Sequence, residues 1–255
     1  MILIDTHTHL YSDQFDEDRQ ETINRALDLG IEKFLLPNID IESIEPMHQL
    51  CNQFPTNCFP MMGLHPTSVK ADYQEVLSYF KTQLTQRNYV AIGEIGIDLY
   101  WDKQFLEQQK LALLEQFQWA IDFQLPIVIH SRDSHQEIME VIKTFNNPNL
   151  HGVFHCFTGT QAQAEEIIDT GFMLGIGGVL TFKNSGLAAV LQNIDLKNII
   201  LETDAPYLSP VPYRGKRNES AYVHLVAQKL AEVKNTSIQQ IASITTANAE
   251  RLFKI

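Results

Sequence analysis

The chain has 255 residues, a formal net charge of −12, a pI near 5.1 and three cysteines. This charge argues against a protein that grips long duplex DNA, and three irregularly spaced cysteines exclude a disulfide framework. No apolar run approaches the ~20 residues of a membrane helix, and Met1 leads directly into an apolar stretch, so we expect a cytoplasmic protein without a membrane partner. The length and the absence of a linker predict one domain over residues 1–255.

Eight short apolar runs predict eight strands. In chain order they cover residues 2–4, 34–36, 59–64, 90–92, 127–129, 153–154, 172–174 and 199–201. The runs are continuously apolar and do not alternate, which is typical of strands buried on both faces in a parallel sheet covered by helices.

Between the runs, apolar residues recur at helical spacing. The clearest stripes are Leu106, Leu113, Leu114, Phe117, Ala120 and Ile121; Ile138, Val141, Ile142 and Phe145; Val223, Val226, Ala227 and Leu230; and Ile238, Ile241, Thr245 and Leu252. Gly30 and Gly171 stand where helices are expected to end. Eight strands alternating with helices predict an α/β fold, a (β/α)8 TIM barrel.

Most of the predicted strands end at a histidine or a carboxylate. In chain order these residues are His7, His9, His65, Glu94, His130, His155 and Asp204. Because the carboxyl ends of barrel strands converge on one mouth, we expect a metal site there. Apart from His65, the set contains four histidines and two carboxylates, which is more than one four-coordinate ion takes. This predicts two divalent ions bridged by Glu94. One would be held by His7, His9 and Asp204. The other would be held by His130 and His155.

Each of these residues also has an ordinary structural explanation. His130 and His155 could be buried histidines with backbone partners, and Glu94 could be a helix cap or an ion-pair partner. Several strand ends would then carry costly polar groups by accident, so the joint pattern favours metal binding. The other histidines fall on predicted helices or loops and receive no role: His48, His135, His151 and His224.

Ordered motifs cover the chain. They are DTHTHL at 5–10, GLHP at 63–66, AIGEIGID at 91–98, HSRD at 130–133, HCFTG at 155–159, ETDAPYL at 202–208, PYRGKRNE at 212–219 and TTANA at 245–249. With these motifs the sequence resembles the TatD family of metal-dependent deoxyribonucleases, within the amidohydrolase-like barrels. The resemblance implies the same six metal ligands, and it places His65 and Arg132 near the substrate.

The resemblance implies hydrolysis of DNA phosphodiester bonds by a metal-activated water, as a 3′–5′ exonuclease on single-stranded ends. We expect Asp204 to accept the proton of the water and His65 to donate one to the leaving oxygen, with Arg132 on a phosphate. Mg²⁺ or Mn²⁺ suits this chemistry, while the imidazole-rich site also suits Zn²⁺.

A basic segment follows Asp204 by ten residues and contains Arg214, Lys216 and Arg217. It is either a solvated surface loop or, beside a metal site, a contact for the phosphate backbone. Tyr207, together with Phe157 and Tyr213, could stack a terminal base. Because the chain is acidic, we expect a short single-stranded footprint without sequence readout.

Two departures from the family pattern concern substrate preference. Leu99 replaces an aromatic residue after the Gly-x-Asp motif, and Ser220 replaces a proline. Three alternative functions stay open: a binuclear hydrolase of a small ester or amide, a D-aminoacyl-tRNA deacylase, and a metal-stabilised scaffold without activity. No obligate protein partner is predicted.

Overall fold

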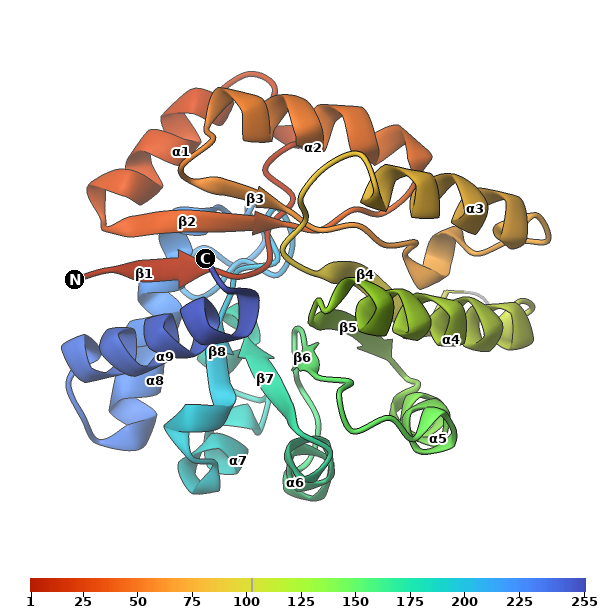
Figure 1. Cartoon of the computed structure of the whole chain (residues 1–255). Coiled ribbons are helices and arrows are strands. Elements are labelled where there is room, and N and C mark those ends of the chain that lie inside the picture. Colours follow the sequence, from red (N-terminus) through yellow and green to blue (C-terminus); the bar gives the residue numbers. More distant parts are fainter. Residues whose placement is uncertain (102) are drawn as a thin grey trace.

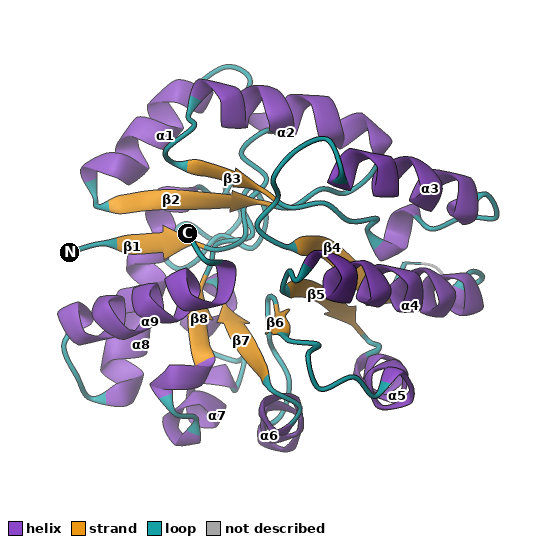
Figure 2. Cartoon of the chain, in the orientation of Figure 1, coloured by secondary structure: helices purple, strands orange, loops and turns teal. Residues whose placement is uncertain are grey.

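The computed structural model describes residues 1–101 and 103–255. Strands and helices alternate along the chain, and the helices surround the strands (Figures 1 and 2). The strands are β1 (Leu3–Asp5), β2 (Ile31–Leu36), β3 (Cys58–Pro60), β4 (Ile92–Asp98), β5 (Ile127–Arg132), β6 (Gly152–Phe154), β7 (Phe172–Ile176) and β8 (Ile199–Leu201). The α-helices are α1 (Arg19–Asp28), α2 (Ile41–Gln53), α3 (Tyr73–Leu84), α4 (Leu106–Phe123), α5 (His135–Phe145), α6 (Gln161–Asp169), α7 (Leu187–Asn193), α8 (Val223–Lys234) and α9 (Ile238–Phe253). All eight predicted strands are therefore confirmed.

The strands form two parallel arcs that meet at two seams. One arc has the order β1-β2-β3 and the other β4-β5-β6-β7-β8. Single parallel bridges join the arcs, between Thr8 and Ala205 at one seam and between Met62 and Ile92 at the other. The amide of Gly93 also donates to the carbonyl of Met62 at 3.0 Å. The predicted α/β barrel is confirmed, with short pairing at both seams.

The inside of the ring is filled by eight apolar side chains, one from each strand or from the segment next to it. This layer contains Ile4, Leu35, Met61, Ala91, Val128, Val153, Met173 and Ile200, all buried. Leu252 and Phe253 of α9 pack against it, and Figure 1 shows this end of α9 over the centre of the ring. The layer gives the opposite mouth of the barrel a dry, low-dielectric floor, which strengthens electrostatic interactions above it.

The largest difference from the predicted elements concerns β4. The apolar run at 90–92 predicted a strand that ends before Glu94, whereas β4 runs from Ile92 to Asp98 and contains Glu94. Glycines hid this from the apolar pattern. At Gly96, φ is +151°, and a Cβ atom there would lie 1.9 Å from the carbonyl oxygen of His130. Only glycine lets β4 approach β5 this closely, and the approach sets Glu94 beside His130.

The other strands overlap the predicted runs but differ at their ends: β3 stops at Pro60 although the run at 59–64 predicted a longer strand, β2 begins three residues before its run, and β5 extends three residues past its run. Gly30 and Gly171 follow α1 and α6 with φ of +81° and +87°, as predicted for glycines that end helices. The predicted stripes on α4 and α5 face the apolar core, with Phe117 and Ile138 fully buried. In the part of the chain that the structure describes, no helix is both long and apolar enough to cross a membrane.

Candidate metal centre

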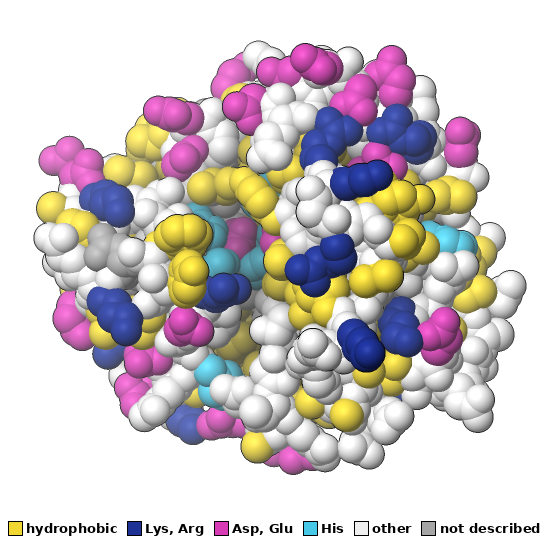
Figure 3. Space-filling model, turned by 180° about the vertical axis from the view of Figure 1, so that it is seen from behind, with side chains coloured by type: hydrophobic (Ala, Val, Ile, Leu, Met, Phe, Trp, Pro, Cys, Tyr) yellow, Lys and Arg dark blue, Asp and Glu magenta, His cyan; other side chains and the backbone are white. Residues whose placement is uncertain are grey.

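The seven residues predicted at the strand ends come together at the mouth of the barrel. Figure 3 shows this face, with histidine and acidic side chains at the floor of a hollow. The hollow is a cavity of about 490 Å³. Six of the seven line it, namely His9, His65, Glu94, His130, His155 and Asp204, while His7 lies beneath them with no exposed surface. Polar residues follow the carboxyl ends of the strands, and these ends all lie at one mouth of the barrel. The site is therefore polar because of where the strands end.

Glu94 is the centre of the cluster. Its Oε1 lies 2.7 Å from Nε2 of His155 and 2.8 Å from Nδ1 of His130, and its Oε2 lies 3.1 Å from Nε2 of His7. Oε1 is also 3.3 Å from Nε2 of His65. Both carboxylate oxygens therefore face imidazole nitrogens, which is the arrangement that the bridging hypothesis requires.

Asp204 completes the other side of the cluster. Its Oδ1 lies 3.5 Å from Nε2 of His9 and 3.8 Å from Nε2 of His7. Asp204 has φ of +59°, in the left-handed region, and its amide donates to the carbonyl oxygen of His7 at 2.9 Å. This backbone conformation occurs three residues after the end of β8 and directs the carboxylate toward the end of β1.

Three sets of these residues have ligand atoms close enough to share an ion. They are His7, His9 and Glu94; His7, His155 and Asp204; and His65, Glu94 and His130. Ligand atoms within each set lie within 4.8 Å of one another. The sets contain all six predicted ligands, but they group His155 with His7 and Asp204, and they add His65. The number of ions and the partition between them stay predictions.

Hydrogen bonds fix which nitrogen of His9 faces the site. The hydroxyl of Tyr11 has one proton, and it donates to the carbonyl oxygen of Pro37 at 2.5 Å. Nδ1 of His9, 2.9 Å from the same hydroxyl, must then be the donor, which leaves an unprotonated Nε2 in the neutral ring. That lone pair faces Oδ1 of Asp204 and, at 3.9 Å, Oε2 of Glu94. Three electron-rich atoms converge, and a cation between them would satisfy all three.

The charges of the cluster also fit a cation. Burial raises the pKa of Glu94, but His155, His65 and His7 outweigh burial and hold that pKa well below its usual range. Burial lowers the pKa of His155, but Glu94 and Glu202 outweigh it, so the pKa of His155 is raised well above its usual value. The pKa of His130 is raised in the same way by Asp98 and Glu94. The raised pKa values show that the carboxylates around these two rings favour positive charge, which divalent ions could also supply.

Two further carboxylates, Asp98 and Glu202, lie behind the predicted ligands His130 and His155. Asp98 Oδ2 accepts from Nε2 of His130 at 2.9 Å, which leaves Nδ1 of that ring toward Glu94. Glu202 Oε1 lies 3.6 Å from Nδ1 of His155. Such carboxylate–histidine pairs are the usual support of metal-binding histidines. Glu202 directly follows the apolar run 199–201, so the pattern of strand ends marked it, although no role was predicted for it. Nothing in the spacing of Asp98 singled it out.

Buried polar atoms without a partner lie in the same region. Among the described residues, Nδ1 of His7, Nδ1 of His155 and Oε2 of Glu202 have no hydrogen-bond partner.

Asp5 is fully buried and accepts from the amide and hydroxyl of Thr203 at 2.9 and 2.6 Å, and burial raises its pKa to about 7. Asp5 thereby ties the end of β1 to the segment after β8, across a seam of the ring.

His65 has the opposite tautomer to His9. The amide of Thr67 donates to Nδ1 of His65 at 3.2 Å, so the proton of the neutral ring is on Nε2. Nε2 points to Glu94 and, at 3.3 Å, to His130. His65 therefore presents a donor to the cavity, which suits the proton donor expected from the sequence better than a metal ligand.

The predicted substrate contacts divide into two groups. Arg132 and Tyr207 line the cavity. Arg214 lies over the ring of Phe182, 3.6 Å from its centroid, and Lys216 is exposed. In the structure as described, neither of them lines the cavity, and nor does Arg217.

Arg217 is engaged elsewhere. Both of its terminal nitrogens contact Asp18 at 2.7 Å, and it lies over the ring of Phe15. Of the other proposed aromatics, Phe157 is buried and Tyr213 stacks on Tyr222 at 4.4 Å.

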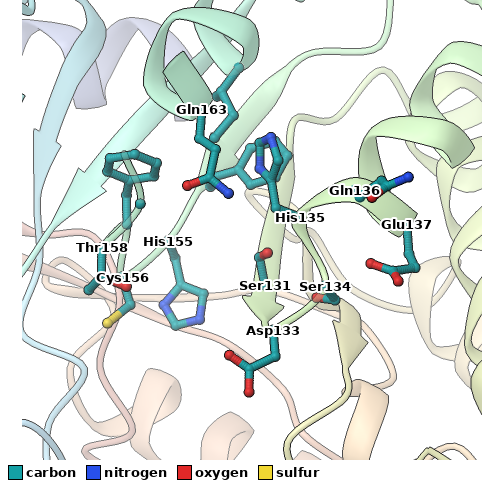
Figure 4. A pocket seen from close by; sticks show the side chains of 14 residues that line it. Ser131, Asp133, Ser134, His135, Gln136, Glu137, His155, Cys156, Thr158 and Gln163 are labelled. Atoms are coloured by element: carbon teal, nitrogen blue, oxygen red, sulfur yellow. The ribbon is translucent and has the colours of Figure 1, made fainter. Parts of the chain in front are cut away.

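A second cavity of about 420 Å³ adjoins the first. Both are lined by Ser131, His155, Cys156 and Thr158. In Figure 4, His155, Ser131 and Asp133 lie toward the centre of this pocket, with Glu137 and Gln163 around it. Its described lining contains two carboxylates and no lysine or arginine.

Comparison with known proteins identifies the family. Residues 4–254 match the family described as TatD related DNase. The chain belongs to this family. It is 37% identical to an uncharacterised metal-dependent hydrolase, YabD of Bacillus subtilis, over all of both chains. It is 32% identical to the 3′-5′ ssDNA/RNA exonuclease TatD of Citrobacter rodentium, over 99% of this chain and 98% of that protein.

A solved structure of a TatD homologue supports the assignment. The crystal structure of YjjV from Escherichia coli superposes with a TM-score of 0.93 at 29% identity, covering 99% of this chain and 98% of that one. The resemblance predicted from the motifs is confirmed, and the chain is a member of a family of metal-dependent hydrolases.

Proposed function

We propose that this TatD-family protein is a metal-dependent deoxyribonuclease that removes nucleotides from the 3′ end of single-stranded DNA. The observation that carries the proposal is the open cavity in which the unprotonated Nε2 of His9 faces the carboxylates of Glu94 and Asp204. A closed four-ligand site would be structural, whereas this one has room for a substrate. The exonuclease name of the Citrobacter rodentium relative supports the substrate and the direction.

His7, His9, Glu94, His130, His155 and Asp204 would hold two divalent ions. Bound there, the ions would supply Lewis acidity and lower the pKa of a coordinated water. Mg²⁺ or Mn²⁺ suits this role, and Zn²⁺ suits the imidazole-rich ligand set.

The protein groups have distinct roles in the proposed hydrolysis. Asp204 is 15% exposed at the cavity. Burial raises its pKa, but the surrounding histidines outweigh burial and hold that pKa below its usual value. It is ionised at neutral pH and can accept the proton of the attacking water. Nε2–H of His65 can donate to the leaving oxygen, and Arg132 can bind a phosphate oxygen at the rim. The apolar floor excludes water beneath them.

The second cavity favours one alternative function. Asp133 and Glu137 line it beside His155, without a lysine or arginine among its described residues, so it disfavours further phosphates and suits an ammonium group. An aminoacyl ester of tRNA carries an ammonium beside the scissile bond. Deacylation of D-aminoacyl-tRNA is therefore the second candidate, and hydrolysis of a small ester or amide is the broader form of the same chemistry.

The test uses a short single-stranded oligonucleotide labelled at its 5′ end and protein loaded with Mn²⁺ or Mg²⁺. We expect a ladder shortened from the 3′ end, with mononucleotide as the product. Glu94→Gln and Asp204→Asn should abolish turnover. Glu166→Gln is the matched control, because Glu166 also contacts a histidine, His135 at 2.9 Å, but lies outside the cluster. Release of an amino acid from D-aminoacyl-tRNA without cleavage of the oligonucleotide would replace the proposal by its alternative.

A further inference from the structure

Two large aromatic side chains stand in solvent at the rim of the metal cavity. Trp101 is 75% exposed and Tyr100 is 55% exposed. Trp101 lines the metal cavity and also a neighbouring cavity of about 230 Å³ between Pro66 and Phe105. No part of the hydrolysis described above uses either ring. Trp101 lines the cavity that a substrate must enter, and Tyr100 packs against Trp101.

The position of these rings is fixed by the same carboxylate that orients a predicted metal ligand. Oδ1 of Asp98 accepts from the amides of Tyr100 at 2.9 Å and of Trp101 at 3.1 Å, while its Oδ2 accepts from His130. Asp98 is buried. The backbone that carries the two rings is therefore held at a constant offset from His130, as a substrate-positioning surface requires.

Arg132 joins the two rings through the pairing of the strands. Asp98 and Arg132 are register partners of β4 and β5, and the amide of Leu99 donates to the carbonyl oxygen of Arg132 at 2.9 Å. The guanidinium lies 4.8 Å from the centroid of the Tyr100 ring, and the rings of Tyr100 and Trp101 meet edge to face at 4.9 Å. Trp101, Tyr100 and Arg132 thus form one continuous surface, which we name the rim platform.

The chemistry of the rim platform matches an unpaired nucleotide. A flat, exposed indole stacks on any nucleobase, and a guanidinium held on an aromatic ring donates to a phosphate oxygen. Stacking needs no basic surface, which suits a chain with a net charge of −12. Leu99, one of the two departures from the family pattern, is buried, and the exposed aromatic side chains stand one and two residues later.

We propose that the rim platform binds the nucleotide next to the scissile phosphate, with its base stacked on Trp101 and its phosphate at Arg132. The inference rests on the proposed function for its substrate. It adds the binding site and the requirement for an unpaired base. Paired ends cannot stack on the platform without fraying, so single-stranded ends are preferred and all four bases are accepted.

Binding of dTMP tests the platform without turnover, since dTMP has no phosphodiester bond. The chain has two tryptophans, and Trp119 is fully buried, so quenching of tryptophan emission by a nucleotide reports Trp101. With Mn²⁺-loaded protein we expect dTMP to quench emission and deoxyribose 5-phosphate, which lacks a base, to leave it unchanged. Trp101→Leu should weaken dTMP binding at least about fivefold, measured by competition, with unchanged binding of deoxyribose 5-phosphate. Tyr79→Leu, on α3 and 44% exposed, is the control for loss of an exposed aromatic ring.

Equal quenching by the two phosphates, or a Trp101→Leu variant with the dTMP affinity of the wild type, would overturn the inference. The proposed function fails separately: protein that binds dTMP on Trp101 but leaves oligonucleotides intact is no deoxyribonuclease. If wild type and Trp101→Leu instead cut oligonucleotides with the same KM, the rim platform is refuted and the proposed nuclease function stands. Thermal unfolding of Trp101→Leu should match the wild type, because the ring is three-quarters exposed.

Discussion

Replacing Tyr11 by phenylalanine removes one oxygen that serves two buried groups. The hydroxyl donates to the carbonyl of Pro37 and accepts from Nδ1 of His9, and the tyrosine is only 6% exposed. Without it, the His9 ring loses the contact that keeps Nε2 unprotonated and directed at Glu94 and Asp204. Loss of such a supporting contact costs about 10–100-fold in metal affinity. This corresponds to about 1.4–2.7 kcal/mol of binding free energy.

The chain offers a matched control for this substitution. Tyr89 is 7% exposed, and its hydroxyl lies 2.9 Å from Nε2 of His48, which is outside the cluster. Tyr11→Phe and Tyr89→Phe thus remove the same tyrosine–histidine contact at two places. We expect both to lower the free energy of unfolding of the metal-free protein by about 1–3 kcal/mol, because each leaves a polar group with one partner fewer.

Only Tyr11→Phe should change metal affinity. The assay is competition between the protein and a chromophoric chelator for Mn²⁺ or Zn²⁺, followed at fixed pH for wild type and both variants. Equal affinities in wild type and Tyr11→Phe would refute the tautomer argument for His9. An equal loss in Tyr89→Phe would show that the effect is general destabilisation.

Two further variants, one double and one single, test the basic segment and its contact with Asp18. Arg214→Gln combined with Lys216→Gln should raise KM for single-stranded DNA and weaken the dependence of KM on salt concentration, since both side chains are exposed. If the salt dependence of KM is unchanged, the two side chains are only solvated surface. Asp18→Asn should lower stability by up to ~1 kcal/mol at pH 7, because Arg217 holds the Asp18 pKa below its ordinary value of 3.8 while both side chains are about a third exposed. A depressed carboxyl pKa stabilises the fold above the unfolded pKa, so thermal unfolding should show the difference between wild type and Asp18→Asn shrinking as the pH falls below about 4. A difference that stays constant down to pH 2 would contradict this assignment.

The convergence of the proposed ligands at one mouth could be predicted from the sequence because the signal is local. An apolar run followed by His7 or His155 is visible in a few residues, and the barrel topology alone brings such strand ends together. The supports of those ligands could not be predicted in this way. Asp98 reaches His130 because of the β4–β5 register, which shifts between Ile92 and Ile95.

The partner of Arg217 also could not be predicted from the sequence. Its position after Asp204 indicated a phosphate contact, but its partner Asp18 lies 199 residues away in the chain. The sequence contains no local sign of this pairing. The sequence likewise gave no sign that Trp101 would stand at the cavity. Its backbone is held there by Asp98, which accepts from the amides of Tyr100 and Trp101.

The seams between the two arcs have a consequence for how the fold holds together. His7, His9 and His65 belong to the arc of β1 to β3, whereas Glu94, His130, His155 and Asp204 belong to the arc of β4 to β8 or its end. One bridge and a few backbone hydrogen bonds join the arcs at each seam, so a divalent ion shared between His9 and Asp204 would add a further cross-link between β1 and the segment after β8. Metal binding would then stabilise the folded barrel, and removal of the metal by a chelator would destabilise the β1–β8 seam at the proposed active site.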